Sequence, residues 1–230
     1  MLGIGMPYWI MIGSIMLVSW LVQWNLKRKF EKYTQIPLRS GMSGKEVAEK
    51  MLRESGVQDV DILSVQGRLT DHYNPMDKTV NLSPEVYSGR SVMAAAVAAH
   101  ECGHAIQHAK SYAFLGMRSK LVPIISISSK YMQWVILIGF FVFSSFPALL
   151  WIGIGMFATT TLFSFVTLPV EFDATNRAKA WLNDSNLTTS QEHAGVSDAL
   201  GAAAMTYVVA ALSSLATLLY YISLALGRRD

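Results

Sequence analysis

The segment VAAHECGHAIQ, residues 97–107, contains the pattern H-E-x-x-H at His100, Glu101 and His104. Good helix formers precede it, and Ser91 is suited to cap the start of that helix. Residues four apart share one face of an α-helix, so both imidazoles can bind one metal ion, with Glu101 beside them as general base toward a water on that ion. The pattern predicts a hydrolase with one Zn²⁺ per chain. The simpler alternative is a helix that carries two hydrogen-bonded histidines and no metal.

Composition and charge distribution place the chain in a membrane. Of its 230 residues, 52% are hydrophobic and 15% are charged, and the mean hydropathy is +0.32. Residues 1–26, 131–170 and 199–227 contain no charged side chain. Uncharged apolar runs of about 20 residues or more are typical of transmembrane helices, and 131–170 is long enough for two. The net charge of +3 is small and no basic patch carries interleaved aromatic residues, so the expected partner is the lipid bilayer and not nucleic acid.

We therefore predict a mainly α membrane protein with about four transmembrane helices and a small α+β cytoplasmic zincin-like portion that carries the HExxH helix. A capping box at Ser43 indicates a helix in this portion, and three short strands are expected at 60–65, 69–73 and 79–82. The predicted parts are an N-terminal transmembrane anchor (1–26), the catalytic portion with the HExxH helix and an interfacial helix (27–130), two transmembrane helices (131–170), a third-ligand helix and loop (171–204) and a C-terminal transmembrane helix (205–230).

Cationic residues indicate which side of the membrane the catalytic portion occupies. Four lysines and arginines lie between residues 27 and 32, after the first apolar run, and two more lie at 177–179, after the third. The positive-inside rule assigns both places to the cytoplasm of a bacterial inner membrane protein. Two spans separate His104 from Glu171, so the chain returns to the side that it left. Arg228 and Arg229 oppose this pattern, and the side of the C-terminus stays open.

Glu171 is the candidate for a third metal ligand. It stands at the end of the third apolar run, where an acidic group is costly unless it is functional or paired. Thermolysin-like zinc sites take a downstream Glu, whereas metzincins take a His at the position that Lys110 occupies here. The alternative is an interfacial Glu171 paired with Arg or Lys. His108 extends the histidine stripe, but eight residues of helix rise about 12 Å, too far for it to share the ion with His100.

Several segments together carry a resemblance: LTDHYNP (69–75), VNLS (80–83), AAHECGHAIQH (98–108), PVEFDA (169–174) and AAAMTY (202–207). In these, the chain resembles the YugP-type neutral zinc metallopeptidases of bacterial membranes and, more distantly, HtpX-like and CAAX-prenyl-protease gluzincins. The resemblance implies a zinc endopeptidase with His100, His104 and Glu171 as ligands and Glu101 as the catalytic residue. The HtpX-like group places an Asp four residues after its ligand Glu; here that position is Thr175, and Asp173 lies only two along.

The expected reaction is hydrolysis of peptide bonds in membrane or membrane-proximal proteins, with a protein or peptide substrate as partner. His72, His193 and Tyr207 are the polar candidates for stabilising the oxyanion, and His108 and Asp173 are candidates for supporting a ligand. One alternative is a non-catalytic, zinc-binding membrane scaffold or chaperone-like protein, whose closed site would take a fourth ligand from His108 or His193. A transporter is less favoured, because the last three spans carry no acid or base within the membrane.

Overall fold

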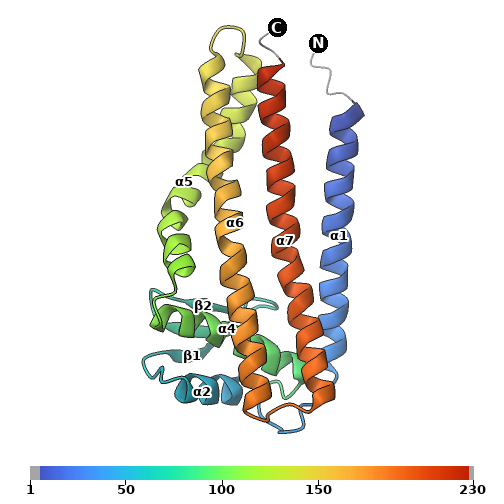
Figure 1. Cartoon of the computed structure of the whole chain (residues 1–230), viewed down its shortest axis with the longest axis vertical. Coiled ribbons are helices and arrows are strands. Elements are labelled where there is room, and N and C mark those ends of the chain that lie inside the picture. The colour runs from blue at the N-terminus through green and yellow to red at the C-terminus, as the bar shows by residue number, and fades with distance from the viewer. Residues whose placement is uncertain (1–5, 228–230) are drawn as a thin grey trace. The chain divides into compact units, whose positions relative to one another are not determined.

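The structure is a computed structural model that describes residues 6–227, so Arg228 and Arg229 lie outside the described residues. The chain divides into two compact units. The first comprises Met1–Tyr112 and Val170–Thr206, and the second comprises Ala113–Pro169 and Tyr207–Asp230. In order, the described elements are α1 (Met6–Thr34), α2 (Gly44–Glu54), β1 (Asp61–Ser64), β2 (His72–Asn74), β3 (Thr79–Leu82), α3 (Pro84–Tyr87), α4 (Val92–Ala109), α5 (Ala113–Phe141), α6 (Pro147–Asp184) and α7 (Ser190–Leu226) (Figure 1).

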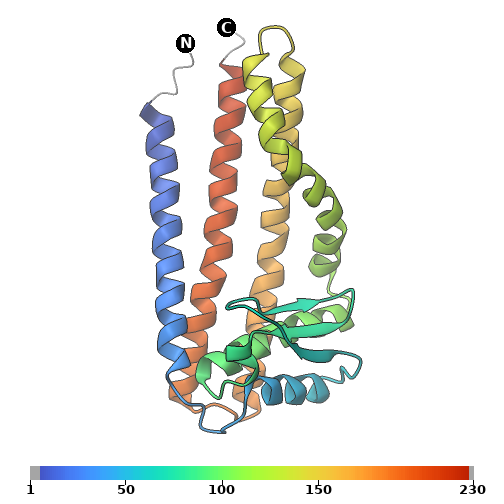
Figure 2. The same cartoon turned by 180° about the vertical axis from the view of Figure 1, so that it is seen from behind.

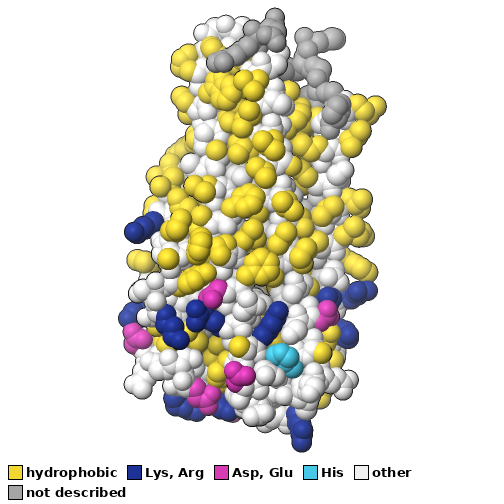
Figure 3. All heavy atoms as spheres, in the orientation of Figure 1, with side chains coloured by type: hydrophobic (Ala, Val, Ile, Leu, Met, Phe, Trp, Pro, Cys, Tyr) yellow, Lys and Arg dark blue, Asp and Glu magenta, His cyan; other side chains and the backbone are white. Residues whose placement is uncertain are grey.

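Within residues 6–227, four helices are long and apolar enough to cross a membrane: α1, α5, α6 and α7. This confirms the prediction of a mainly helical protein with about four such helices. The expected turn before Pro147 is present, because α5 ends at Phe141 and α6 begins at Pro147. On the face shown in Figure 3, hydrophobic side chains cover the long helices, and charged side chains gather over the segments around α2 and α4.

The long helices extend well beyond the apolar runs in the sequence. The interfacial helix expected before residue 131 is continuous with the following span in α5, which contains Pro123 and is bent in Figure 2. Glu171 and the residues after it continue α6 without a break, and α7 begins at Ser190, well before the expected start of the last span. A proline inside a helix removes one backbone donor, which accounts for a bend in α5.

The three strands form a mixed sheet in the order β1-β3-β2. Strand β3 pairs in parallel with β1 (Asp61 opposite Thr79) and antiparallel with β2 (Tyr73 opposite Val80). Every residue of β3 is buried, whereas β2 is an edge strand. Strand β2 begins three residues later than expected, because Leu69 has a φ of 60°, outside the extended region.

The core of the first unit is built around α4. Six alanines of this helix, between Ala94 and Ala105, are buried against side chains of α2, β3 and α1, among them Met51, Val80 and Phe30. Small residues on α4 let these elements approach closely, so the helix that carries the H-E-x-x-H motif is fixed on several sides. The second unit has its own small core, which includes Ile136, Leu150, Ile154 and Ala225.

Both predicted helix caps that flank this core are present. Ser43 accepts from the backbone N–H of Glu46, whose carboxylate accepts from the backbone N–H of Ser43, so the capping box is complete. The hydroxyl of Ser91 accepts from Ala94 N at 3.2 Å and starts α4. Reciprocal bonds of this kind satisfy donors that an uncapped helix leaves open.

Candidate metal centre

Three of the residues singled out from the sequence lie together in the first unit. His100 and His104 stand on one face of α4 with their ring centroids 4.8 Å apart and the rings nearly perpendicular. The Nε2 atoms of the two rings lie 3.4 and 3.5 Å from the same atom, Oε2 of Glu171. Among the described residues, these three offer ligand atoms that all lie within 4.8 Å of one another.

A close approach of two helices brings Glu171 to α4. A Cβ added to Gly103 would lie 2.7 Å from the backbone oxygen of Ala174, a distance that real Cβ atoms essentially never show, and 3.0 Å from its Cα. Gly103 is one of the two unspecified positions of the H-E-x-x-H pattern. Only glycine at this position allows the backbone of α6 to come close enough for Glu171 to face both histidines.

A buried amide orients His104. Nε2 of Gln107 donates to the backbone oxygen of Val170 and to Oδ2 of Asp173, each at 2.8 Å, and its Oε1 lies 3.1 Å from Nδ1 of His104. The side chain is fully buried. The two bonds from Nε2 fix the orientation of the amide, so that its oxygen faces His104. An amide oxygen only accepts, so Nδ1 of His104 carries the hydrogen and, in the neutral ring, Nε2 presents a lone pair toward Glu171.

The other histidine has a partner on α6. The hydroxyl of Thr175 lies 3.3 Å from Nδ1 of His100, and Thr175 is itself buried. Thr175 thus contacts one histidine, while Asp173 supports the other through Gln107 and also accepts from Nε of Arg177 at 2.6 Å. Thr175 therefore helps to fix the ring of His100, and Asp173 helps to fix the ring of His104.

These three side chains fit a zinc ion. Two imidazole nitrogens and one carboxylate oxygen are the protein ligands of one common class of catalytic zinc site, which leaves a position open for water or substrate. Neutral imidazole lone pairs that face a buried carboxylate repel it unless a cation lies between them. Burial lowers the pKa of His104, but the hydrogen bond that its protonated form can donate to Glu171 and the charge of Glu101 outweigh burial and leave that pKa raised. The centre therefore favours a positive charge.

Glu101 is held by the edge strand of the sheet. Its side chain is buried, and Oε2 accepts from the backbone N–H of Tyr73 on β2 at 3.0 Å. Just before β2, Asp71 accepts from the backbone N–H and the hydroxyl of Ser83 at 2.7 and 3.2 Å, and burial raises the pKa of its carboxyl group. The start of β2 is thereby fixed, and so is the strand that holds Glu101.

The remaining candidates lie in other surroundings. His108 lies with Nδ1 2.7 Å from the hydroxyl of Tyr73, and the exposed His72 has Nδ1 2.8 Å from the backbone oxygen of Thr70. Neither belongs to the cluster of ligand atoms found among residues 6–227, and the same is true of His193 on α7. Tyr207, also on α7, is the first residue of the last segment of the second unit. Catalytic or supporting roles for these residues stay predictions.

Sequence reasoning did not single out Gln107, the role of Thr175 toward His100, or the backbone of Tyr73. Gln107 follows His104 by three residues, so it lies on nearly the same face of the helix, and this spacing is the one signal that pointed to it. The other two contacts depend on the approach of α6 and of β2, which periodicity does not encode.

Comparisons with known proteins agree with this geometry. Residues 8–226 match the model of a family described as "Putative neutral zinc metallopeptidase". The chain is 41% identical over 219 residues to a Bacillus subtilis (strain 168) protein named "Putative membrane protease YugP", covering 95% of this chain and 96% of that protein. No solved structure matches. The chain therefore belongs to the YugP-type family of neutral zinc metallopeptidases.

Proposed function

We propose that this protein is a zinc-dependent endopeptidase of the gluzincin type that hydrolyses peptide bonds in membrane or membrane-proximal proteins. His100, His104 and Glu171 would hold one zinc ion, and Glu101 would be the catalytic residue. The observation that carries the proposal is the convergence of both Nε2 atoms on Oε2 of Glu171, with Glu101 fixed beside them. Family membership supports the same chemistry.

When bound, zinc supplies a Lewis acid that lowers the pKa of a water to around neutrality and polarises the scissile carbonyl. Glu101 would receive a proton from the attacking water and pass it to the leaving amine. The bond from the N–H of Tyr73 engages Oε2 of Glu101 and leaves the other carboxylate oxygen for the proton. Gln107 and Thr175 contact the Nδ1 atoms of His104 and His100, so that the Nε2 atoms would be left to hold the ion.

The edge strand beside Glu101 supports a peptide as substrate. Strand β2 pairs on one side only, with β3, and its Tyr73 reaches Glu101 through a backbone atom. An extended peptide can pair with such an edge by main-chain hydrogen bonds, which recognise any sequence. The edge of β2 would then align a substrate backbone next to the catalytic carboxylate.

The position of the third ligand supports substrates at the membrane. Glu171 follows the uncharged run 131–170 directly, within the same helix, α6. The cations at 27–32 and 177–179 favour a cytoplasmic position for the metal centre in a bacterial inner membrane. Loops close to the bilayer are the peptide segments that such a centre would meet first.

The rival function is a non-catalytic zinc-binding scaffold. A structural zinc site has four protein ligands. The cluster found among the described residues has three, and His108, a candidate for the fourth, is engaged with Tyr73. The open position favours catalysis.

The test is cleavage of a quenched casein substrate by the detergent-purified protein, wild type beside Glu101→Gln, with zinc content measured in both. We expect activity only in wild type and one zinc in each. A matched control is Glu49→Gln on the exposed face of α2, which should keep full activity. Cleavage by Glu101→Gln at the wild-type rate, with zinc retained, would contradict the assignment of the base.

A further inference from the structure

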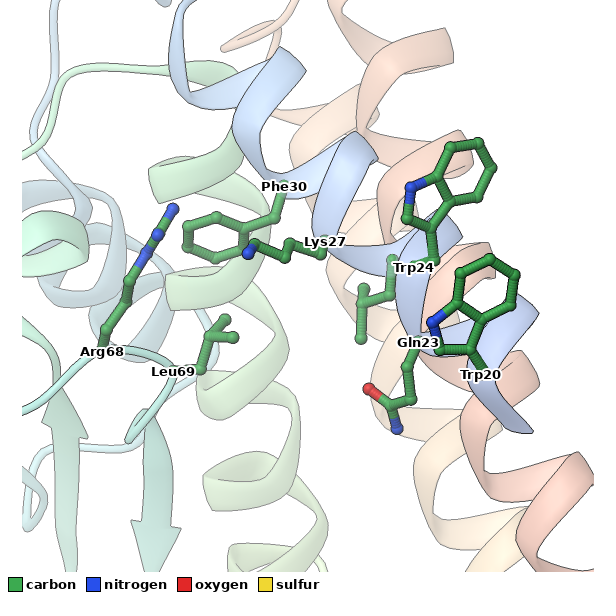
Figure 4. Close-up of a pocket in the computed structure, with 8 residues that line it drawn as sticks. Trp20, Gln23, Trp24, Lys27, Phe30, Arg68 and Leu69 are labelled. Atoms are coloured by element: carbon green, nitrogen blue, oxygen red, sulfur yellow. The ribbon is translucent and has the colours of Figure 1, made fainter. Parts of the chain in front are cut away.

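A groove opens in the first unit where the uncharged run of α1 ends. Its walls come from two places, residues 20–30 of α1 and the loop between β1 and β2, and its volume is about 570 Å³ (Figure 4). Arg68 and Leu69 are the loop residues that line the groove, and the guanidinium of Arg68 lies 5.5 Å from the ring centroid of Phe30. This contact holds the loop against the helix, so both walls belong to one built feature.

The charged side chains in the groove wall are cationic. Lys27 and Arg68 line it, and no carboxylate of the described residues does. Figure 4 shows Lys27 extending from α1 toward the side of the groove where Arg68 stands beside Phe30. Glu85 pairs with Nε of Arg68 at 3.2 Å, which leaves the other donors of a five-donor group, and no described ion pair involves Lys27. A ligand between the two cations would be an anion.

The other end of the groove is aromatic and apolar. Trp20 and Trp24 line it with their rings stacked 6.5 Å apart, and both side chains are about half exposed or more. They stand on a helix that is long and apolar enough to cross a membrane, within the last turns before Lys27, its first charged residue. Tryptophans followed by a lysine mark the depth at which acyl chains give way to headgroups.

The loop presents an apolar side chain in a strained conformation. Leu69 has a φ of 60° and is 56% exposed, an unfavourable combination for a bulky residue that no buried contact explains. Gly67, with a φ of 109°, and the bond from the hydroxyl of Thr70 to the backbone oxygen of Gln66 shape this turn. Strain of this kind persists where it serves a binding surface. Here it places a leucine beside Arg68 in the groove wall.

We propose that this groove binds an anionic phospholipid of the surrounding bilayer. The phosphate would lie between Lys27 and Arg68, and an acyl chain would lie along Trp20 and Trp24, with Leu69 against the same chain. Charge complementarity selects an anionic headgroup over a zwitterionic one, because each cation near a negatively charged membrane surface adds to the attraction. The groove is built only from residues outside the metal centre, so the proposal stands apart from the catalytic one.

The test uses full-length protein in nanodiscs of phosphatidylcholine, with and without phosphatidylglycerol. Lipid retained by the protein is measured by native mass spectrometry after transfer to detergent, and the unfolding temperature is measured in both discs. Wild type should retain phosphatidylglycerol in preference and unfold at a higher temperature in its presence. Lys27→Gln with Arg68→Gln should weaken apparent binding of phosphatidylglycerol roughly tenfold or more, as the loss of two cations predicts.

The matched control is Arg39→Gln with Arg53→Gln, which removes the same charge from two exposed positions outside the groove and should behave as wild type. If the groove variant is unstable in phosphatidylcholine, Lys27→Gln alone decides, because it breaks no described ion pair or hydrogen bond. Equal retention of both lipids by wild type, or a preference that the groove variant keeps, would overturn the proposal. If wild type forms dimers that the groove variant does not form, and neither shows a lipid preference, the occupant of the groove is a second copy of the chain, and the proposal is overturned as well.

Discussion

Replacing Gln107 with leucine tests whether the buried amide orients His104. Leucine has nearly the same volume but can neither donate nor accept, so the variant loses the bonds to Val170, Asp173 and His104 together. At about 1 kcal/mol for each hydrogen bond, the free energy of unfolding should fall by roughly 3 kcal/mol. The ring of His104 would also be free to adopt the other tautomer, in which Nε2 carries the hydrogen and cannot bind a metal ion.

Loss of a partner to the outer nitrogen of a metal-binding histidine typically weakens metal affinity by about 10- to 100-fold, or about 1.4 to 2.7 kcal/mol. The affinity is measured by competition between the detergent-purified protein and a chromophoric zinc chelator, at a temperature well below unfolding. Gln191→Leu, at an exposed position in the first turn of α7, is the control and should bind zinc as wild type does. Wild-type zinc affinity in folded Gln107→Leu would refute the tautomer argument, whatever the change in stability.

Four further results are expected. Gly103→Ala should lower the free energy of unfolding by about 1–3 kcal/mol and reduce zinc content, because the new methyl group meets the backbone of Ala174. Gly116→Ala, with open space around it, is the control and should cause neither change; thermal unfolding measures the stability and metal analysis the zinc content. Ser43→Ala should lower stability by about 1 kcal/mol through loss of the cap of α2, with zinc affinity unchanged, and a large drop in zinc affinity would contradict a purely local role. Burial raises the pKa of the Asp71 carboxyl group, so the folded state binds this proton more tightly than the unfolded state. The stability that this proton contributes is complete below the ordinary pKa of 3.8 and is lost as the pH rises through the folded value. Unfolding temperatures of Asp71→Asn, measured over the same pH range, should lack this decline. Removal of zinc by a chelator should abolish cleavage and lower the unfolding temperature, and added zinc should restore both, since an ion bound only to the folded state stabilises it.

The sequence predicted which side chains converge at the centre better than it predicted the residues that support them. Helical spacing was sufficient to place His100 and His104 on one face, and the cost of an acid at the end of an apolar run singled out Glu171. Gln107 was overlooked because its partners, Val170 and Asp173, lie more than sixty residues away, on a helix whose approach depends on the packing of Gly103.

The elements were predicted less accurately at their ends than in their middles. Hydropathy marks the part of a helix that lies in lipid, but α6 and α7 continue as helices through polar residues such as Arg177 and Glu192, where hydropathy gives no signal. The caps at Ser43 and Ser91 were predicted correctly, because a cap is a local hydrogen bond that the sequence specifies over three residues.

The two residues that the H-E-x-x-H pattern leaves unspecified are constrained here by neighbours. Cys102 is fully buried with Sγ 3.7 Å from the backbone oxygen of Ala48, and Gly103 gives room to α6. A designer who transplants the motif into another helix therefore needs more than two histidines and a glutamate. The recipient scaffold must offer a second helix at backbone distance opposite the fourth residue of the motif, and a glycine there to receive it. Without that helix, the graft would contain the motif but would lack the carboxylate that lies opposite both histidines here.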